Sequence, residues 1–555
     1  MSYFKSMSPF ALIFFTLLSF SLWGGVNLKN GNFYVSYTDI VVPGGGKNLK
    51  ITRTYNSKSA KRGWFGFGWG SNFETSLKVA ADGSVIIREY GSGAATRFTP
   101  KEDLNVEDAV SRIMKAMVSQ GQSVDGSYGE NLKKELTNNE EKRRKFGEKY
   151  LVKVKIREGT ELYSVKRGLQ KVVKLKKGFV RSFTNGNREE YDQNGKLIKI
   201  SHSNGYSIRF KYKNNKLDSI KDSDAKQIFF KWYGSGNVKS ISSIGKRKAL
   251  YKYEKGNLIE ATDVGGNTYK HKYDEKKNML QITYSDKSTR SIDYETNTGF
   301  VRKIVGRDGS TTQYEYGNNP KNKDLHYWTT VKNETAGNVK SLNRYEYELK
   351  RRKDGSSYTY RTITSENGVK TETTYNDCCS LPLKVEKSVV FKDETRKDVT
   401  SFKYNEDGLL VQKETSDGNF VKLDYHKKFN KITKVSTNSG TTRFKYNKQG
   451  KLSQALDKDG NSVLLIYDRK GRIGKMVDFQ KERNSKRSLS FKYNSIGKPI
   501  EIAMSNVGKI NVTYDNYGNI KRVKSSSGSK IAAQVTSAFQ SLLGIIRPAG
   551  VTLGN

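Results

Sequence analysis

Cysteine and proline are scarce in this chain. Its 555 residues include two cysteines, Cys378 and Cys379, which are adjacent, and seven prolines. Two neighbouring thiols cannot link distant segments, so the fold does not depend on a disulfide framework. We expect either two thiols or a strained vicinal disulfide at this position. The low proline content, together with 50 glycines and 33 tyrosines, favours many short strands joined by tight turns.

The residue patterns of metal and catalytic sites are also missing. No histidine lies at ligand spacing from another histidine or from the cysteines; the four are His202, His271, His326 and His426. The glycines in residues 63–70 lack the Lys-Ser/Thr of a phosphate-binding loop, and no Gly-x-Ser-x-Gly nucleophile motif occurs. We therefore predict no catalytic, cofactor-binding or metal-binding residues, no cofactor, and a protein that is not an enzyme.

Long hydrophobic runs are limited to one near the N-terminus, at residues 10–23. Lys5 precedes this run and Gly24 and Gly25 follow it, which is typical of a secretory signal peptide, and the run is too short to span a bilayer comfortably. We predict that residues 1–25 are a signal peptide cleaved near Gly24 or Gly25. The mature chain would then have no transmembrane segment and would be exported: periplasmic, on the cell surface or secreted.

Acidic residues are outnumbered by basic ones. The chain has 100 Lys and Arg against 56 Asp and Glu, a formal charge of +44, and the basic residues are scattered through every segment. Such a field attracts anionic polymers, and lysines also solvate the outer faces and edges of strands. We expect a cell-surface carbohydrate or another anionic envelope polymer as a partner, and we do not expect nucleic acid to be the physiological one.

Tyrosine recurs at a fixed interval in the second half of the chain. Tyr404, Tyr425, Tyr446 and Tyr467 are evenly spaced. A period in the range of roughly 20 to 50 residues marks one supersecondary unit stacked many times. The motif Tyr-Asn/Asp-x-x-Gly begins at Tyr191, Tyr404, Tyr446, Tyr467, Tyr493 and Tyr514. A second turn, often Asn-Gly or Asp-Gly, lies midway between successive copies and suits a tight hairpin. Each repeat is therefore predicted to be a β-hairpin with strands of roughly six residues.

The repeats extend over a long array. Weaker copies continue the spacing through the first half, and the pattern loosens between residues 317 and 398, which indicates longer hairpins or a change of direction. Roughly two dozen strands about 4.8 Å apart would make a ribbon too wide to stay flat, so the sheet must coil. We predict a mostly β fold: antiparallel β-hairpins in residues 150–523 that form a spiral sheet or partial shell, apolar and aromatic on one face and lysine-rich on the other.

The remaining segments are assigned by composition. Residues 26–100 alternate strand formers and turns and include the glycine and aromatic cluster 63–70, which we interpret as a cap on the array, with a stacking surface for sugars or bases as the alternative. Residues 101–149 carry apolar residues at helical spacing and dense mixed charge, which predicts a helical insert of one or two helices. Residues 524–555 are predicted to form a C-terminal helix or tail.

Two parts of the sequence resemble a known family. The N-terminal segments 31–33, 52–56 and 67–69 resemble the domain that opens many bacterial Rhs and YD-repeat proteins, and the Tyr-Asn/Asp-x-x-Gly repeats resemble YD repeats. The resemblance implies an array that spirals into a hollow β shell. In contrast with such proteins, no proline here follows an aspartate, and the segment after Tyr514 is too short for a nuclease or deaminase domain. We expect the last helix to lie on the concave face of the sheet.

These patterns lead to three functional hypotheses. The first is an exported, non-enzymatic β-repeat scaffold that binds carbohydrate, another anionic polymer or a docked protein. The second is a truncated Rhs-type shell that encapsulates or delivers a separately encoded toxin. The third is an enzyme that acts on polysaccharide in a cleft of the array.

Overall fold

The computed structural model gives a mostly β protein with four helices in its described residues. The predicted signal peptide up to residue 24 and the Cys378–Cys379 pair lie outside these residues. No helix within them is long and apolar enough to cross a membrane. The structure describes residues 25–42, 48–59, 61–91, 93–164, 170–203, 205–243, 247–377, 380–391, 394–495, 497–514 and 520–546.

A single antiparallel sheet of 36 strands dominates the fold, because every strand from β7 to β42 pairs with the next along the chain. Strands β10–β42 alone are 33, more than the roughly two dozen predicted for the array, and the three strands of residues 75–99 join the same sheet. Its first strands are β7 (Thr75–Val79), β8 (Val85–Glu89), β9 (Ala94–Thr99), β10 (Glu161–Ser164), β11 (Lys171–Leu175), β12 (Gly178–Ser182), β13 (Arg188–Tyr191), β14 (Leu197–Ser201), β15 (Ser207–Lys213), β16 (Lys216–Asp222), β17 (Gln227–Trp232), β18 (Val238–Ser243), β19 (Lys248–Glu254), β20 (Asn257–Thr262), β21 (Thr268–Tyr273), β22 (Met279–Thr283), β23 (Thr289–Tyr294), β24 (Val301–Val305) and β25 (Thr311–Asn318).

The looser part of the repeat pattern forms longer hairpins, as predicted. We call β13–β25 the first arm, β26–β31 the linking strands and β32–β42 the second arm. The linking strands are β26 (His326–Thr335), β27 (Asn338–Arg351), β28 (Ser357–Glu366), β29 (Val369–Tyr375), β30 (Pro382–Phe391) and β31 (Glu394–Tyr404). The second arm comprises β32 (Leu410–Thr415), β33 (Phe420–Tyr425), β34 (Ile432–Thr437), β35 (Gly440–Tyr446), β36 (Leu452–Leu456), β37 (Ser462–Tyr467), β38 (Ile473–Gln480), β39 (Ser485–Tyr493), β40 (Pro499–Met504), β41 (Gly508–Tyr514) and β42 (Ile520–Ser525).

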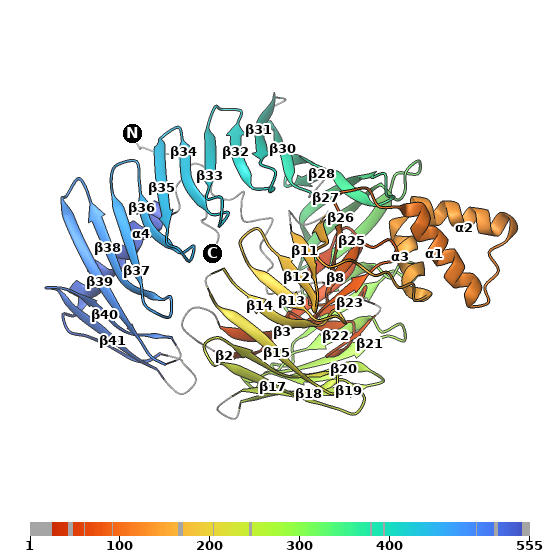
Figure 1. The fold of residues 1–555 in the computed structure, drawn as a ribbon, viewed down its shortest axis with the longest axis horizontal. Coiled ribbons are helices and arrows are strands. Elements are labelled where there is room, and N and C mark those ends of the chain that lie inside the picture. The colour runs from red at the N-terminus through yellow and green to blue at the C-terminus, as the bar shows by residue number, and fades with distance from the viewer. Residues whose placement is uncertain are drawn as a thin grey trace.

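The sheet coils without closing on itself. Its first strand, β7, is covered where it meets the turn before β14: Ser76 forms an antiparallel bridge with Lys196, and the Leu77 N–H donates to the Gly195 carbonyl at 2.9 Å. At the other end, β42 pairs with β41 and no register joins it to β7 among the described residues. Figure 1 shows the second arm, cyan to blue, curving away from the yellow and green first arm. The array is therefore a partial shell with one free edge.

The repeat tyrosine has a defined structural role. Most repeat tyrosines lie at or near the end of a strand beside a β-bulge, as at Tyr446, where the register with the following strand shifts. Its hydroxyl donates to the carbonyl of the residue that is paired with the preceding repeat's tyrosine: Tyr425 is opposite Ile432, and Tyr446 donates to the Ile432 carbonyl at 2.6 Å. A bulge interrupts the hydrogen bonds between the two strands locally. The tyrosine hydroxyl therefore gives the backbone carbonyl a hydrogen-bond partner that the neighbouring strand does not provide.

The same bond recurs along both arms, and Trp232 makes it with its indole N–H. The donors and acceptor carbonyls are Tyr212 to Leu197, Trp232 to Leu217, Tyr253 to Val238, Tyr273 to Leu258, Tyr294 to Met279, Tyr316 to Val301, Tyr425 to Leu410, Tyr467 to Leu452, Tyr493 to Ile473 and Tyr514 to Pro499. The tyrosine period is therefore the spacing at which one hairpin is locked to the hairpin before it.

The two faces of the sheet differ, as strand alternation requires. In β15, Ile208 and Phe210 are buried whereas Arg209 and Lys211 are exposed, and in the second arm Phe444 is buried. On the apolar face the first arm packs against a small N-terminal sheet, which Figure 1 shows enclosed by yellow and green strands. That sheet consists of β1 (Gly25–Asn27), β2 (Asn32–Val42), β3 (Leu49–Asn56) and β6 (Trp69–Ser71), with the two-stranded β4 (Arg62–Gly63) and β5 (Gly66–Phe67) beside it.

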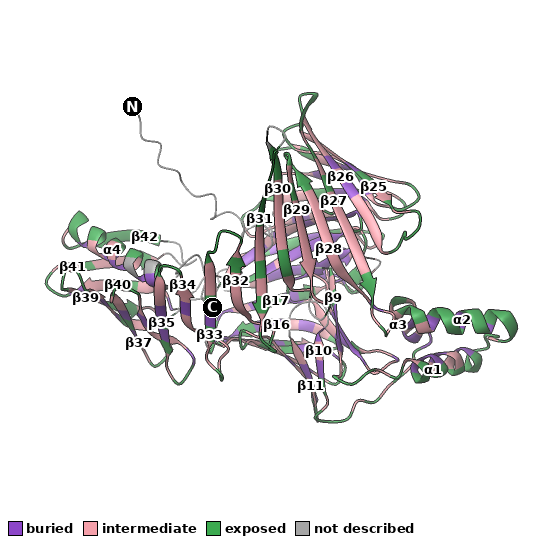
Figure 2. Cartoon of the chain, turned by 90° about the horizontal axis from the view of Figure 1, so that it is seen from above, coloured by how far each residue is buried: buried purple, intermediate pink, exposed green. Residues whose placement is uncertain are grey.

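The second arm has its own cover. Helix α4 (Ser529–Ile546) packs on the apolar face of the second arm through Ile531, Val535, Ala538, Leu542 and Ile545, which are buried against Met476 and Leu489. By contrast, no described residue of β27–β31 is buried. Figure 2 shows β27–β31 in pink and green. Strand β26, however, is packed: Val331 belongs to the core of the first arm, and the buried Thr329 donates to the Leu28 carbonyl at 2.6 Å.

The helical insert contains three helices, where the sequence predicts one or two: α1 (Val106–Ser119), α2 (Gly126–Asn138) and α3 (Glu140–Lys149). The break before α3 arises at Asn139, whose side chain caps α3 by accepting from the Lys142 N–H at 3.0 Å. The apolar face of α1 packs mainly on α2 and α3, and it reaches the sheet at Ala81. Figure 1 shows the insert projecting from one side of the shell.

Candidate functional site: a basic cleft between the two arms

A cleft of about 930 Å³ lies where turns of the first arm face turns of the second arm. The second-arm wall is built from the repeat motif itself, because the turns that begin at Tyr467 and Tyr493 both line it. The lining residues are Ser203, Gly205, Tyr206, Ser223, Asp224 and Ala225 on the first arm, and Gln449, Lys451, Tyr467, Arg469, Lys470, Gly471, Arg472, Ile473, Tyr493, Ser495, Gly497 and Pro499 on the second.

Four cationic side chains line the second-arm wall. Arg469 and Lys470 are exposed at the tip of the β37–β38 turn and have no ion-pair partner among the described residues. Arg472 is neutralised in part by Asp468, which accepts from its Nε at 2.7 Å. Lys451 donates to the Gly471 carbonyl at 2.8 Å, and burial lowers the pKa of its ammonium group. Arg469 and Lys470 therefore supply the uncompensated positive charge.

Tyrosine rings stand beside these cations. The guanidinium of Arg472 lies 4.5 Å from the centre of the Tyr493 ring, and the Lys451 ammonium lies 5.4 Å from that of Tyr467. Burial raises the pKa of Tyr467 to about 12, so its hydroxyl stays protonated and donates to the Leu452 carbonyl. The hydroxyl hydrogen bonds of Tyr467 and Tyr493 fix the positions of both rings at the wall of the cleft. Aromatic rings of this kind are surfaces on which sugar rings pack.

The first-arm wall is less charged. Tyr206 donates to the Asp222 carboxylate at 2.9 Å, and Lys226 lies 3.0 Å from Asp222 and 3.2 Å from Asp224. One lysine therefore faces two carboxylates, which leaves this wall with a small negative balance. With Ser203 and Ser223 nearby, the wall offers hydroxyl groups. The cleft can thus hold an extended anionic chain, with its acidic groups on the second arm and its hydroxyls on the first.

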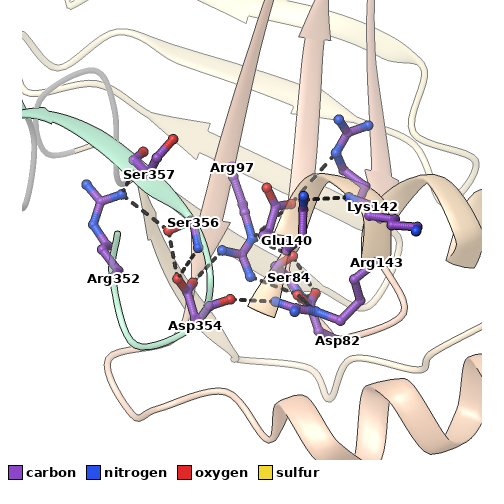
Figure 3. Close-up of polar contacts among 12 residues, drawn as sticks. Asp82, Ser84, Arg97, Glu140, Lys142, Arg143, Arg352, Asp354, Ser356 and Ser357 are labelled. Carbon is purple, nitrogen blue, oxygen red and sulfur yellow. Dashed lines mark hydrogen bonds and ion pairs between the residues drawn. The ribbon is translucent and has the colours of Figure 1, made fainter. Parts of the chain in front are cut away.

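A second polar cluster, at the base of the helical insert, is structural. Figure 3 shows Arg97 between Asp82 and Asp354, with Arg143 beside them. The Arg97 guanidinium lies 2.7 Å from Asp82 and 2.6 Å from Asp354, and Arg143 donates to the Asp354 carbonyl at 2.8 Å. The hydrogen bond from Ser356 and the charge of Arg97 outweigh burial and hold the pKa of Asp354 at about 2. The cluster ties α3 and the β27–β28 turn to β8 and β9.

Buried polar groups also join the N-terminal sheet to the first arm. Asp39 accepts from the Arg53 Nε at 2.9 Å and from the Tyr251 hydroxyl at 2.8 Å, and Asp39 and Arg53 are both fully buried. The Arg53 guanidinium lies 4.3 Å from the Tyr37 ring and 4.6 Å from the Trp69 ring. The ion pair joins β2 to β3 within the N-terminal sheet, and the Tyr251 hydroxyl crosses the interface to it from β19. No sequence pattern pointed to it, because the partners are 14 and 212 residues apart.

The glycine and aromatic cluster 63–70 is part of this interface. Phe65 and Trp69 are buried, and the Phe65 ring packs edge-on against Tyr251 at 5.0 Å. The alternative of an exposed stacking surface for these two rings is therefore wrong, and the cluster seals the apolar face of the array as a cap. The cleft instead contains Tyr467 and Tyr493, which are partly exposed and which sequence reasoning treated only as repeat markers.

Comparison with known proteins finds a family match at the N-terminus. Residues 24–98 match a family described as a domain of unknown function (DUF6531). The tRNA nuclease WapA of Bacillus subtilis (strain 168) is 36% identical over 80 residues, which are 14% of this chain and 3% of that protein. The tRNA3(Ser)-specific nuclease WapA of Bacillus spizizenii matches over the same length at the same identity. The chain thus covers a very small part of these relatives.

Solved structures give weaker matches over more of the chain. A crystal structure of TcdB2-TccC3 aligns with 91% of this chain and 28% of its own, at 12% identity and a TM-score of 0.43. The Photorhabdus luminescens Tc holotoxin pore aligns with 89% of this chain and 29% of its own, at 12% identity and a TM-score of 0.36. The N-terminal match and the hairpin repeats together support an Rhs-type or YD-repeat-type scaffold.

Proposed function

We propose that this chain is an exported, non-enzymatic scaffold that binds an acidic carbohydrate polymer in the cleft between its two arms. The observation that carries the proposal is the second-arm wall, where Arg469 and Lys470 are exposed without ion-pair partners among the described residues, beside the rings of Tyr467 and Tyr493. Acidic groups of a polymer would pair with the cations while its sugar rings pack on the tyrosines.

The location of the cleft favours a long ligand over a small one. It lies between two rows of turns, and its residues come from three repeat turns of the second arm and two turns of the first. A polymer that bridges the arms would also stabilise their relative position, because it binds only the arrangement in which both walls face it. The scattered surface lysines would add a weaker, salt-sensitive attraction.

The test is binding of a carboxylated or sulfated oligosaccharide to the purified chain, measured by calorimetry beside an uncharged oligosaccharide of the same length. Arg469→Gln combined with Lys470→Gln is expected to weaken binding of the acidic oligosaccharide about tenfold. The matched control is Lys211→Gln with Lys213→Gln, which removes the same charge from the outward face of β15 and should change binding less than twofold. Equal losses of affinity in the two double variants would show that the overall positive charge of the chain, and not the cleft, binds the polymer.

A second candidate is a shell that holds a separately encoded toxin. Two observations favour it: 80 residues of the chain are 36% identical to the tRNA nuclease WapA, and strands β27–β31 have no buried residue among those described. A bound protein would cover those strands. Co-expression with the products of adjacent genes should then yield a complex in which the amides of β27–β31 exchange more slowly. Absence of any complex, with unchanged exchange, would reject this candidate.

A further inference from the structure

Two of the linking strands bring a histidine and two glutamates together on their polar face. His326 on β26 is directly opposite Glu348 on β27, and Glu346 is two residues before Glu348 and so on the same face. The His326 Nε2 atom lies 2.6 Å from Glu346 Oε1 and 3.9 Å from Glu348 Oε1. The three side chains offer one donor atom each within 4.8 Å, and each is 20–24% exposed.

The donors and their spacing suit a transition-metal ion. Zn²⁺ binds imidazole nitrogen and carboxylate oxygen at about 2.0–2.2 Å, so two donors on one ion are about 3–4 Å apart. The His326 and Glu348 atoms already have this spacing. His326 and Glu346 are closer because a proton lies between them, and an ion that replaces this proton would move them slightly apart. The partial exposure of all three leaves room for water on the ion.

The surrounding charges permit a dication but compete for the carboxylates. Arg361 donates to both oxygens of Glu348, at 3.1 and 2.5 Å, and to Glu372 at 3.1 Å. Arg344 lies 3.3 Å from Glu346. Three carboxylates against two guanidiniums leave a negative balance while His326 is neutral. Asn319 Nδ2 lies 3.1 Å from His326 Nδ1. A metal on Nε2 requires the ring proton on Nδ1, and a half-turn of the Asn319 amide presents Oδ1 to accept it.

We propose that His326, Glu346 and Glu348 form a binding site for a divalent transition-metal ion of the Zn²⁺ type. A mixed nitrogen and oxygen donor set favours such an ion over Mg²⁺ or Ca²⁺, which prefer oxygen alone. The ion would crosslink β26 to β27, where the packed first arm passes into strands β27–β31, which have no buried residue among those described. The sequence did not predict the site, because the ligands lie far apart along the chain and meet only through the strand register.

The experiment is a titration of the full chain with Zn²⁺, and with Mg²⁺ as the comparison, followed by calorimetry and by Trp328 fluorescence. The Trp328 ring lies 6.0 Å from that of His326, so Co²⁺ in place of Zn²⁺ should quench it. We expect one Zn²⁺ per chain at this site and a Zn²⁺-dependent rise in thermal stability. His326→Gln or Glu346→Gln should weaken this binding at least tenfold, and the matched control His426→Gln should leave it unchanged.

A variant that should tighten Zn²⁺ binding distinguishes a metal site from a network of ion pairs. Arg361→Gln removes the guanidinium that competes for Glu348, so it should tighten Zn²⁺ binding severalfold. If the cluster is only a lattice of ion pairs, Arg361→Gln and His326→Gln will both lower thermal stability and neither will alter Zn²⁺ binding. That result, or unchanged Zn²⁺ stoichiometry in His326→Gln, would overturn the proposal. Circular dichroism of each variant confirms that the sheet is retained.

Discussion

Replacing Tyr446 by phenylalanine tests the structural role of the repeat tyrosine. The change removes only the hydroxyl that donates to the Ile432 carbonyl at 2.6 Å, and Ile432 is buried, so the carbonyl loses its partner where water has little access. A net hydrogen bond contributes about 0.5–1.5 kcal/mol, and an unsatisfied buried group costs about 1–3 kcal/mol. Because Tyr446 itself is only partly buried, we expect the opening free energy of its hairpins to fall by about 1–2 kcal/mol.

Hydrogen exchange measures this loss locally, which suits an array whose units rely on their neighbours. A loss of about 1–2 kcal/mol makes amides open roughly five- to thirty-fold more often. We expect that increase in β33–β36 and no change in β15–β20 of the first arm. The control is Tyr128→Phe, whose ring is exposed on α2. Unchanged exchange in β33–β36 would refute the view that these hydroxyls lock successive hairpins.

Two further predictions concern pH. The pKa of Asp354 is held at about 2, below its ordinary 3.8, so its ion pair stabilises the folded state above about pH 4 and is lost as pH falls towards 2. Amide hydrogen exchange in α3 should therefore become faster as pH falls from 4 to 2. Asp354→Asn should make this exchange faster at neutral pH, whereas Asp108→Asn, in an exposed ion pair within α1, should not. Burial raises the pKa of Glu74 from its ordinary 4.5 to about 8 despite the Trp64 N–H, so folded-state stability falls as pH rises from 4.5 to 8. Glu74→Gln should remove this loss of stability at high pH. Allowing for the partial exposure of Glu74, the variant should have an unfolding free energy at pH 9 about 2 kcal/mol higher than the wild type. Identical denaturant unfolding curves for wild type and variant at pH 9 would contradict the prediction.

The repeat architecture was readable because its signals are local. A short strand, an Asp-Gly turn and a terminal tyrosine all lie within one repeat, so a single copy such as 446–467 predicts the hairpin and its neighbours. The alternation of Phe444 with Lys445 also identified the apolar face. The number of strands was underestimated, because the hairpins of the array itself supply 33 strands, β10–β42. The three strands in residues 75–99 were not predicted to continue the array, because membership of a sheet depends on which strands pair.

The candidate sites could not be predicted from the sequence, because the residues that form them are not close together along the chain. The cleft exists only because the turn at Asp224 faces the turn at Arg469 after the sheet has coiled, and coiling accumulates over many strands. The Asp39–Arg53–Tyr251 interface likewise joins segments far apart in the chain. Sequence patterns detect ligands that are neighbours along a helix or loop, whereas His326 and Glu348 become neighbours through cross-strand register.

The tyrosine bond also gives the array a direction of growth. Each hydroxyl reaches back to the preceding hairpin, so removal of one complete repeat rejoins a tyrosine to an equivalent carbonyl, whereas removal of half a repeat leaves both without a partner. Insertions and deletions of whole repeats should therefore be tolerated in the second arm, and those of other lengths should not. The shell can be lengthened or shortened in whole hairpins, and the span between its arms changes in the same steps.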